Sequence, residues 1–256
     1  MKKSKIFLII LAVIIALISV LVWWQFGNIK SAYYWFKYDK ENISELIDKQ
    51  NDDVDKILKD RQDLNVRQST EAEQKLHQEE LINDDEFIDV LTGKTDVPEM
   101  FGQDIGLDES KNFVDSNGNP ISKEELQEAK KDTDTQSSQA DDKQKASECV
   151  ARMYVLKSNF EGRLGSLFNE AKAHYLTYPY EERVKKKGEI LKDFYLKAVA
   201  LEKECDSNVD KVLNELDAIL TRTGEDKSII TKIRESYDNE KSLKKAYYLN
   251  LYNSKS

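Results

Sequence analysis

The chain has 256 residues, with 39 Lys and Arg, 48 Asp and Glu, nine Gly, three Pro, two Cys and two His. So few Gly and Pro, without an alternation of short strands and turns, argue against an all-β sandwich and against a doubly wound α/β enzyme. Two His and two Cys leave little material for a zinc cluster or a Cys–His nucleophile. The composition therefore predicts a mainly α protein that is not an enzyme and binds no metal or cofactor.

An apolar run extends from Ile6 to Trp24 and is interrupted only by Ser19. As a helix it would be roughly 28 Å long, close to the thickness of the hydrocarbon core of a bilayer. Lysines at positions 2, 3 and 5 precede it, which by the positive-inside rule places the N-terminus in the cytoplasm. We therefore predict a cytoplasmic tail at 1–5, a transmembrane anchor in the lipid bilayer at 6–24, and an extracytoplasmic remainder in a single-pass protein of the cell membrane.

A cleaved signal peptide is the alternative interpretation of the same run. Such a peptide has an apolar region of about 7–15 residues and ends in a small-x-small cleavage site. Here the run is longer and ends Val-Leu-Val-Trp-Trp-Gln-Phe, and no lipobox cysteine follows it. The sequence favours the uncleaved anchor.

Charge is distributed unevenly after the anchor. Residues 31–130 contain 12 Lys and Arg against 26 Asp and Glu, whereas residues 148–256 contain 20 against 18. This asymmetry predicts separate modules in one chain. The acidic balance of the whole chain, together with the extracytoplasmic location, argues against a nucleic-acid partner.

Residues 30–64 are predicted to form a juxtamembrane helix or coil. Apolar side chains recur there at spacings of three and four in a narrow stripe: Ile43, Ile47, Val54, Ile57 and Leu58. The aromatic cluster at 33–36 is predicted to lie at the membrane interface or to pack on a partner helix.

Residues 70–130 are predicted to form a small acidic α+β module. Its apolar spacing indicates one or two short helices that end near Gly93, and residues 113–121 are typical of a hairpin about an Asn-Gly turn. Ser122 and Glu125 match the capping box of a further helix. Because about 60 residues make only a marginal core, this module is expected to be loosely stabilised.

Residues 131–147 contain no apolar side chain larger than Ala and are predicted to be a flexible linker. Residues 148–256 are predicted to form an antiparallel three-helix bundle. Its first helix breaks at Tyr178-Pro179, and its second ends at Gly224. Along the second helix a heptad repeat is formed by Val184, Leu191, Ala198, Cys205, Val212 and Ile219.

Several patterns that suggest chemistry are incomplete. Gly93-Lys94-Thr95 lacks the first glycine of a phosphate-binding loop, because Ile88 stands at that position. The segment from Asp115 resembles a calcium loop but has Pro120 where that loop needs glycine. His77 and His174 have no second ligand at metal spacing and are expected to be exposed on helices.

Cys149 and Cys205 are the only cysteines in the chain, and the predicted export makes a disulfide possible. Their midpoint lies at residue 177, beside the predicted break, so in an antiparallel hairpin they would lie at the same height. We therefore predict a structural disulfide between them; two buried thiols are the alternative.

The turn of the predicted hairpin combines aromatic and basic side chains: Tyr175, Tyr178, Tyr180, Arg183, Lys185, Lys186 and Lys187. Such a tip can bind an anionic polymer or a small anion. The alternative is a solvated helix end whose tyrosines pack locally.

The layout of a basic tail, one span, a coil and a small exported domain resembles that of bitopic components of bacterial envelope machines, such as division and pilus-assembly subunits. A likeness of layout does not fix function. Two functions are expected: an interaction or scaffolding component of the cell envelope, which binds another envelope protein or itself through the coil or bundle, or a module that binds an anionic wall polymer or small ligand through the 175–187 tip.

Overall fold

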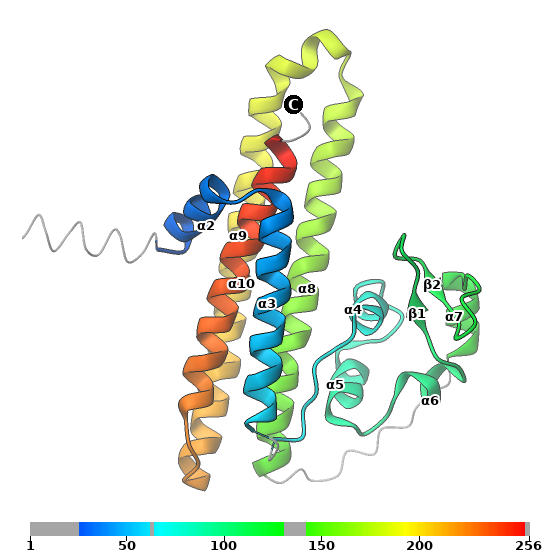
Figure 1. The fold of residues 1–256 in the computed structure, drawn as a ribbon, viewed down its shortest axis with the longest axis vertical. Coiled ribbons are helices and arrows are strands. Elements are labelled where there is room, and N and C mark those ends of the chain that lie inside the picture. The colour runs from blue at the N-terminus through cyan, green and yellow to red at the C-terminus, as the bar shows by residue number, and fades with distance from the viewer. Residues whose placement is uncertain (1–25, 62–63, 131–141, 254–256) are drawn as a thin grey trace, which may run out of the picture. The chain divides into compact units, whose positions relative to one another are not determined.

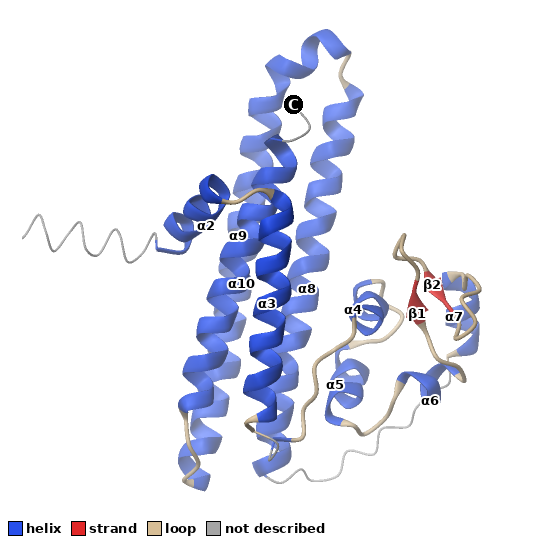
Figure 2. Ribbon diagram, viewed as in Figure 1, coloured by secondary structure: helices blue, strands red, loops and turns tan. Residues whose placement is uncertain are grey.

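The computed structural model describes residues 26–61, 64–130 and 142–253 (Figure 1). Figure 2 shows that these residues are mainly helical, which confirms the predicted fold class at that level. The predicted tail and anchor, and residues 131–141 of the predicted linker, lie outside the described residues. Within the described part, no helix is both long enough and apolar enough to span a membrane.

The chain divides into two compact units. The first contains α2 (Phe26–Lys37), α10 (Ser228–Asn253) and all but the end of α3 (Lys40–Lys59), and the second extends from Leu58 to Lys227. This division differs from the predicted one, in which α10 belonged to a bundle formed by residues 148–256. The narrow apolar stripe of α3 instead has its partner on α10.

In the first unit, α3 and α10 run antiparallel. Ile43 packs in one buried cluster with Leu243 and Ala246, and Gln50 Nε2 donates to Ser236 Oγ at 3.1 Å. Ile43, near the start of α3, meets residues near the end of α10, whereas Gln50, farther along α3, meets the earlier Ser236. This order shows that the two helices are antiparallel. The stripe predicted as a coiled-coil seam therefore packs within the chain itself.

The predicted juxtamembrane helix is two helices rather than one. It is interrupted between α2 and α3 at Tyr38 and Asp39, and Asp39 Oδ1 accepts the backbone N–H of Asn42 at 2.8 Å. A carboxylate in this position caps the first turn of a new helix, which explains the break.

In the second unit, α8 (Asp142–Thr177) and α9 (Tyr180–Thr223) form a long antiparallel hairpin. The predicted break at Tyr178-Pro179 is confirmed, and Gly224 ends α9 in the left-handed conformation at φ 74°. The helix α8 begins at Asp142, five residues before the predicted end of the linker at residue 147, and Ala146 and Ser147 are already buried.

The small module has six short elements. They are α4 (Glu71–Gln78), α5 (Asp84–Thr92), α6 (Val97–Phe101), β1 (Gly106–Leu107), β2 (Phe113–Val114) and α7 (Lys123–Ala129). The predicted end near Gly93 and the capping box of Ser122 and Glu125 are confirmed. Fully buried side chains form its core: Leu76, Phe87, Leu91, Met100 and Leu126.

The only strands among the described residues, β1 and β2, pair antiparallel. Around the predicted Asn-Gly turn the chain also folds back, since Val114 bridges Pro120 and Ile121 N–H donates to Phe113 O at 2.8 Å. Strand β2 therefore lies between two partners, with β1 on one side and the returning residues Pro120 and Ile121 on the other.

Candidate functional site

The tip of the α8–α9 hairpin brings together the aromatic and basic residues that the sequence placed there. Arg183 lies over the ring of Tyr175, 5.7 Å from its centroid, and donates to the carbonyl oxygens of Leu176 at 3.2 Å and Tyr178 at 2.9 Å. Leu176 lies in the last turn of α8 and Tyr178 directly follows the helix, so neither carbonyl has a partner within the helix. Arg183 therefore stabilises the turn itself.

Lys186 is also bound within the tip. Its Nζ lies 5.7 Å from the centroid of the Tyr178 ring and 2.8 Å from Glu189 Oε2, and the hydrogen bond to Glu189 raises the pKa of Lys186. His174, exposed as predicted, lies 5.5 Å from the Tyr178 ring, centroid to centroid. Local packing thus engages two of the basic groups, while Lys185 is exposed.

Apolar side chains are exposed along the half of α9 that adjoins the tip. We define the outer stripe as Tyr180, Val184, Leu191, Tyr195 and Val199. Tyr180 is 80 % exposed, Val184 79 %, Tyr195 51 % and Val199 38 %, whereas Leu191 is half-buried. At 100° per residue all five lie within one 100° arc of the helix.

The outer stripe continues a face that is buried in the other half of α9. Val209, Leu213, Leu216 and Leu220 follow on the same arc and are at most 4 % exposed. The predicted heptad repeat changes in the same way, since Val184 is 79 % exposed whereas Cys205, Val212 and Ile219 are at most 7 % exposed. Sequence periodicity indicates that a face is apolar and does not tell which part of it is covered.

Basic residues border the outer stripe. Lys185 and Lys192 lie on one side of it, and both are exposed, while Lys187 lies on the other. The exposed Glu181 lies at the same edge as Lys185 and Lys192, so this surface combines an apolar centre with edges that carry more Lys than Glu.

The small module packs against α8 near the opposite end of the hairpin. Ala151 and Ser158 are fully buried, and a Cβ at Gly162 would approach Gln78 Cγ to 3.3 Å. Small side chains at these spacings let α4 and α5 approach α8 closely. They form a second face of α8, which the sequence interpretation missed because it followed only the large apolar residues.

A chain of polar groups connects this contact. His77 Nδ1 lies 2.9 Å from Ser158 Oγ on α8, and its Nε2 lies 2.8 Å from Asp84 Oδ1. The predicted exposure of His77 is wrong: the residue is buried and stacks on Phe87 with centroids 4.7 Å apart.

The residue types match a Ser–His–Asp nucleophile, but the burial is the reverse of what that chemistry needs. Ser158 is fully buried, whereas the Asp84 side chain is 63 % exposed. A substrate has to reach the serine of such a triad. The arrangement therefore links the module to the hairpin.

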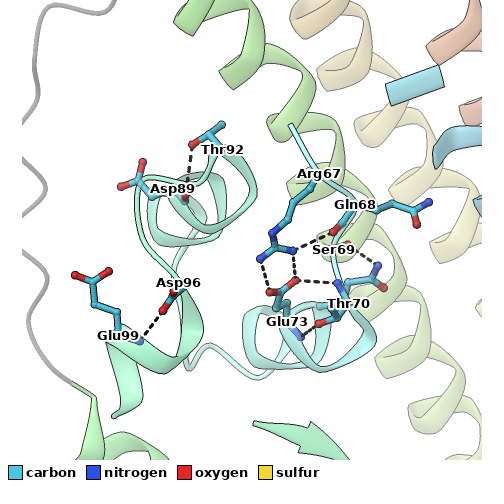
Figure 3. A network of polar contacts seen from close by, with 10 residues as sticks. Arg67, Gln68, Ser69, Thr70, Glu73, Asp89, Thr92, Asp96 and Glu99 are labelled. Carbon is cyan, nitrogen blue, oxygen red and sulfur yellow. Dashed lines mark hydrogen bonds and ion pairs between the residues drawn. The ribbon is translucent and has the colours of Figure 1, made fainter. Parts of the chain in front are cut away.

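Figure 3 shows the polar network at the start of the module. Arg67 donates to the two carboxylate oxygens of Glu73 at 2.9 and 2.6 Å, and Glu73 also accepts the backbone N–H of Thr70 at 2.8 Å. Burial acts to raise the pKa of the Glu73 carboxyl, but these hydrogen bonds outweigh it and hold the pKa below its usual value. These hydrogen bonds stabilise the first turn of α4.

Lys94, from the incomplete phosphate-loop motif, has a structural partner on each side. Its Nζ lies 3.1 Å from Asp89 on α5 and 3.1 Å from Glu148 on α8. In the calcium-like segment, Asp115 Oδ1 accepts the N–H groups of Asn117 and Asn119 at 2.8 and 2.9 Å. Within the described ranges, no three His, Cys, Asp or Glu side chains are grouped to hold a metal ion.

Cys149 and Cys205 are two buried thiols, and the predicted disulfide is absent. Arg163 pairs with Glu204 at 2.6 Å, so Cys205 faces α8 about 13 residues beyond Cys149, or roughly 20 Å away. A disulfide needs a Cα separation of roughly 4.4–6.8 Å. The prediction is wrong because the first turns of α9 cross the tip, as Figure 1 shows, which shifts the pairing of the helices.

Comparison with known proteins gives no relative for this chain. No family model, no curated protein and no solved structure matches it.

Proposed function

We propose that the protein is a membrane-anchored interaction or scaffolding component of the bacterial cell envelope, which binds a partner through the outer stripe of α9. The observation that carries this proposal is the exposure of the stripe, beginning with Tyr180 at 80 % and Val184 at 79 %. Contiguous exposed apolar side chains with a polar border are typical of protein interaction sites.

The kind of partner follows from the surface. The stripe spans 20 residues of α9, and the first turns of that helix cross the tip (Figure 1), so a second helix would pack along the remainder of the stripe and reach Tyr180 at the bend. Its border carries Lys185, Lys187 and Lys192. Charge complementarity therefore favours a partner helix with an apolar face and acidic edges.

Site-specific photocrosslinking in cells tests this surface. A benzophenone amino acid at Tyr180 should form an adduct with a second polypeptide, and Val184→Asp with Tyr195→Asp should abolish that adduct. The same probe at Lys197, exposed on another face of α9, is the matched control. Equal adducts at both positions, or an adduct that survives both aspartates, would refute the proposal.

Anchoring by residues 6–24 is tested separately. The full chain should keep its N-terminus and stay in the membrane pellet after washing with alkaline carbonate. Detection of a mature protein that starts between residues 22 and 35 would show cleavage and refute the anchor.

The second candidate is a binding module for an anionic wall polymer, favoured by the pairing of Tyr175 with Arg183 and of Tyr178 with Lys186 at one tip. Salt-sensitive polymer binding that is lost on replacing Lys185, Lys186 and Lys187 with Ala would support it. Unchanged photocrosslinking in the same variant would leave the scaffold as the primary function.

A further inference from the structure

The helix α2 has one face inside its unit. Ser31 is 3 % exposed, Lys30 donates to Asn239 on α10, and Tyr34 and Tyr38 pack against the buried cluster around Ile43. These contacts fix the rotation of α2 about its own axis. The opposite face is therefore held outward.

The outward face is aromatic. Phe36 is 90 % exposed, Tyr33 is 52 % exposed and Trp35 is 38 % exposed, and Ala32 lies between them. Burying one such side chain stabilises a protein by about 1.5–3 kcal/mol, so three exposed side chains within about one turn of helix are costly in water. Tyr and Trp are the side chains enriched where a bilayer meets water, since their rings are apolar and their tips polar.

Two observations identify what covers this face. The apolar run that ends at Trp24 lies two residues before α2 begins at Phe26. Because α2 has 12 residues and is about 18 Å long, no part of its outward face can be far from the point where that run ends. In addition, Lys37 borders the face and its Nζ lies 2.6 Å from Tyr33 Oη, a placement that suits anionic headgroups.

We propose that the outward face of α2, formed by Tyr33, Trp35 and Phe36, lies in the headgroup region of the lipid bilayer. The helix is then an interfacial support that sets the direction in which α3 leaves the membrane, with the break at Tyr38 and Asp39 as the bend. This inference rests on the proposed anchor, and it adds a second contact with the same lipid.

Tryptophan fluorescence of the full chain in vesicles tests the inference. Trp35 becomes the sole tryptophan when Trp23 and Trp24 are replaced by Phe, because the chain has three. The protein is reconstituted in vesicles of phosphatidylcholine and phosphatidylglycerol. Trp35 should be quenched by lipids brominated near the headgroup end of their chains and several-fold less by aqueous iodide than a tryptophan in water.

A control tryptophan is available on the other unit. Leu196→Trp, with Trp23, Trp24 and Trp35 all replaced by Phe, has a side chain about as exposed as Tyr33 and outside the outer stripe, since Leu196 is 56 % exposed. Its quenching by aqueous iodide gives the reference value for a water-exposed tryptophan in the same chain. In the Trp35 protein, Phe36→Asp should reduce quenching by brominated lipid.

The outcomes separate this inference from the anchor. Carbonate-resistant protein whose Trp35 is open to iodide would overturn the interfacial helix and leave the anchor standing. Shielding from iodide without quenching by brominated lipid would show a protein contact and also overturn it. Protein that does not bind the vesicles would overturn both.

Discussion

Removing the Ser158 hydroxyl tests how the module is attached to the hairpin. In Ser158→Ala the imidazole of His77 keeps Asp84 but loses the group 2.9 Å from its Nδ1. Ser158 is fully buried and the His77 side chain is only 3 % exposed, so water cannot replace the hydroxyl without rearrangement. A buried polar group left without its partner costs about 1–3 kcal/mol.

Hydrogen exchange measured by mass spectrometry on the full chain gives the readout. Opening of α4 and α5 should become about tenfold more frequent for every ~1.4 kcal/mol lost, with exchange at the tip of the hairpin unchanged. Ser166→Ala, an exposed serine on the same helix, is the matched control and should have no effect.

A double variant separates the hydrogen bond from simple loss of packing. His77→Phe keeps a ring against Phe87, and in combination with Ser158→Ala it removes both polar groups at once. Replacing both partners by apolar groups is close to neutral, so the double variant should recover much of the loss. Strictly additive losses, or no loss in Ser158→Ala alone, would refute the inferred link.

Three further predictions concern single groups. Glu73→Gln should destabilise the module at pH 7, because the pKa of the Glu73 carboxyl in the folded state lies below the unfolded-state value of about 4.3. The stabilisation by the ionised carboxylate is complete above the unfolded-state pKa and is lost as the pH falls through the folded-state pKa. Urea unfolding should therefore show the stabilities of the two proteins converging in acid. Gly93→Ala should cost about 1–2 kcal/mol, because Gly93 has φ 73°, whereas Gly188→Ala inside α9 should stabilise by about 0.5–1 kcal/mol, both measured by thermal unfolding. Alkylation of non-reduced, denatured protein should label both Cys149 and Cys205; a disulfide-linked peptide would contradict the pairing of α8 with α9.

Local signals in the sequence predicted local structure well. The Tyr178-Pro179 break, the glycine that ends α9 and the capping box of Ser122 all depend on residues within a few positions of each other. Their physical causes are restricted dihedral angles and short-range hydrogen bonds, which do not depend on the rest of the chain.

Long-range pairing was predicted less well, for reasons that individual residues show. The predicted disulfide required the correct offset between two helices, and the crossing of the tip by α9 changed that offset by about 13 residues. The buried His77 required knowledge that Ser158 faces it across 81 positions of sequence. Neither fact leaves a periodic trace in the sequence.

The candidate site was predicted in part. The residues of the tip do lie together, but the structure uses Arg183 to complete the end of α8 and pairs Lys186 with Glu189. Basic residues in a sequence therefore do not by themselves indicate an open anion site. The exposed apolar side chains beside them, which looked like ordinary heptad positions, became the stronger indication of function.

The difference between the two halves of α9 explains why one heptad repeat can serve two purposes. Where Val212 and Ile219 are buried, the repeat stabilises the fold, and truncating either side chain would remove packing. Where Val184 is 79 % exposed, the same repeat adds no packing within the chain. An apolar residue at such a position does not stabilise the monomer, so its contribution comes only when a partner covers it. A partner helix would extend the buried face of α9 toward the tip, and the lysines beside the stripe would select the charge of that helix.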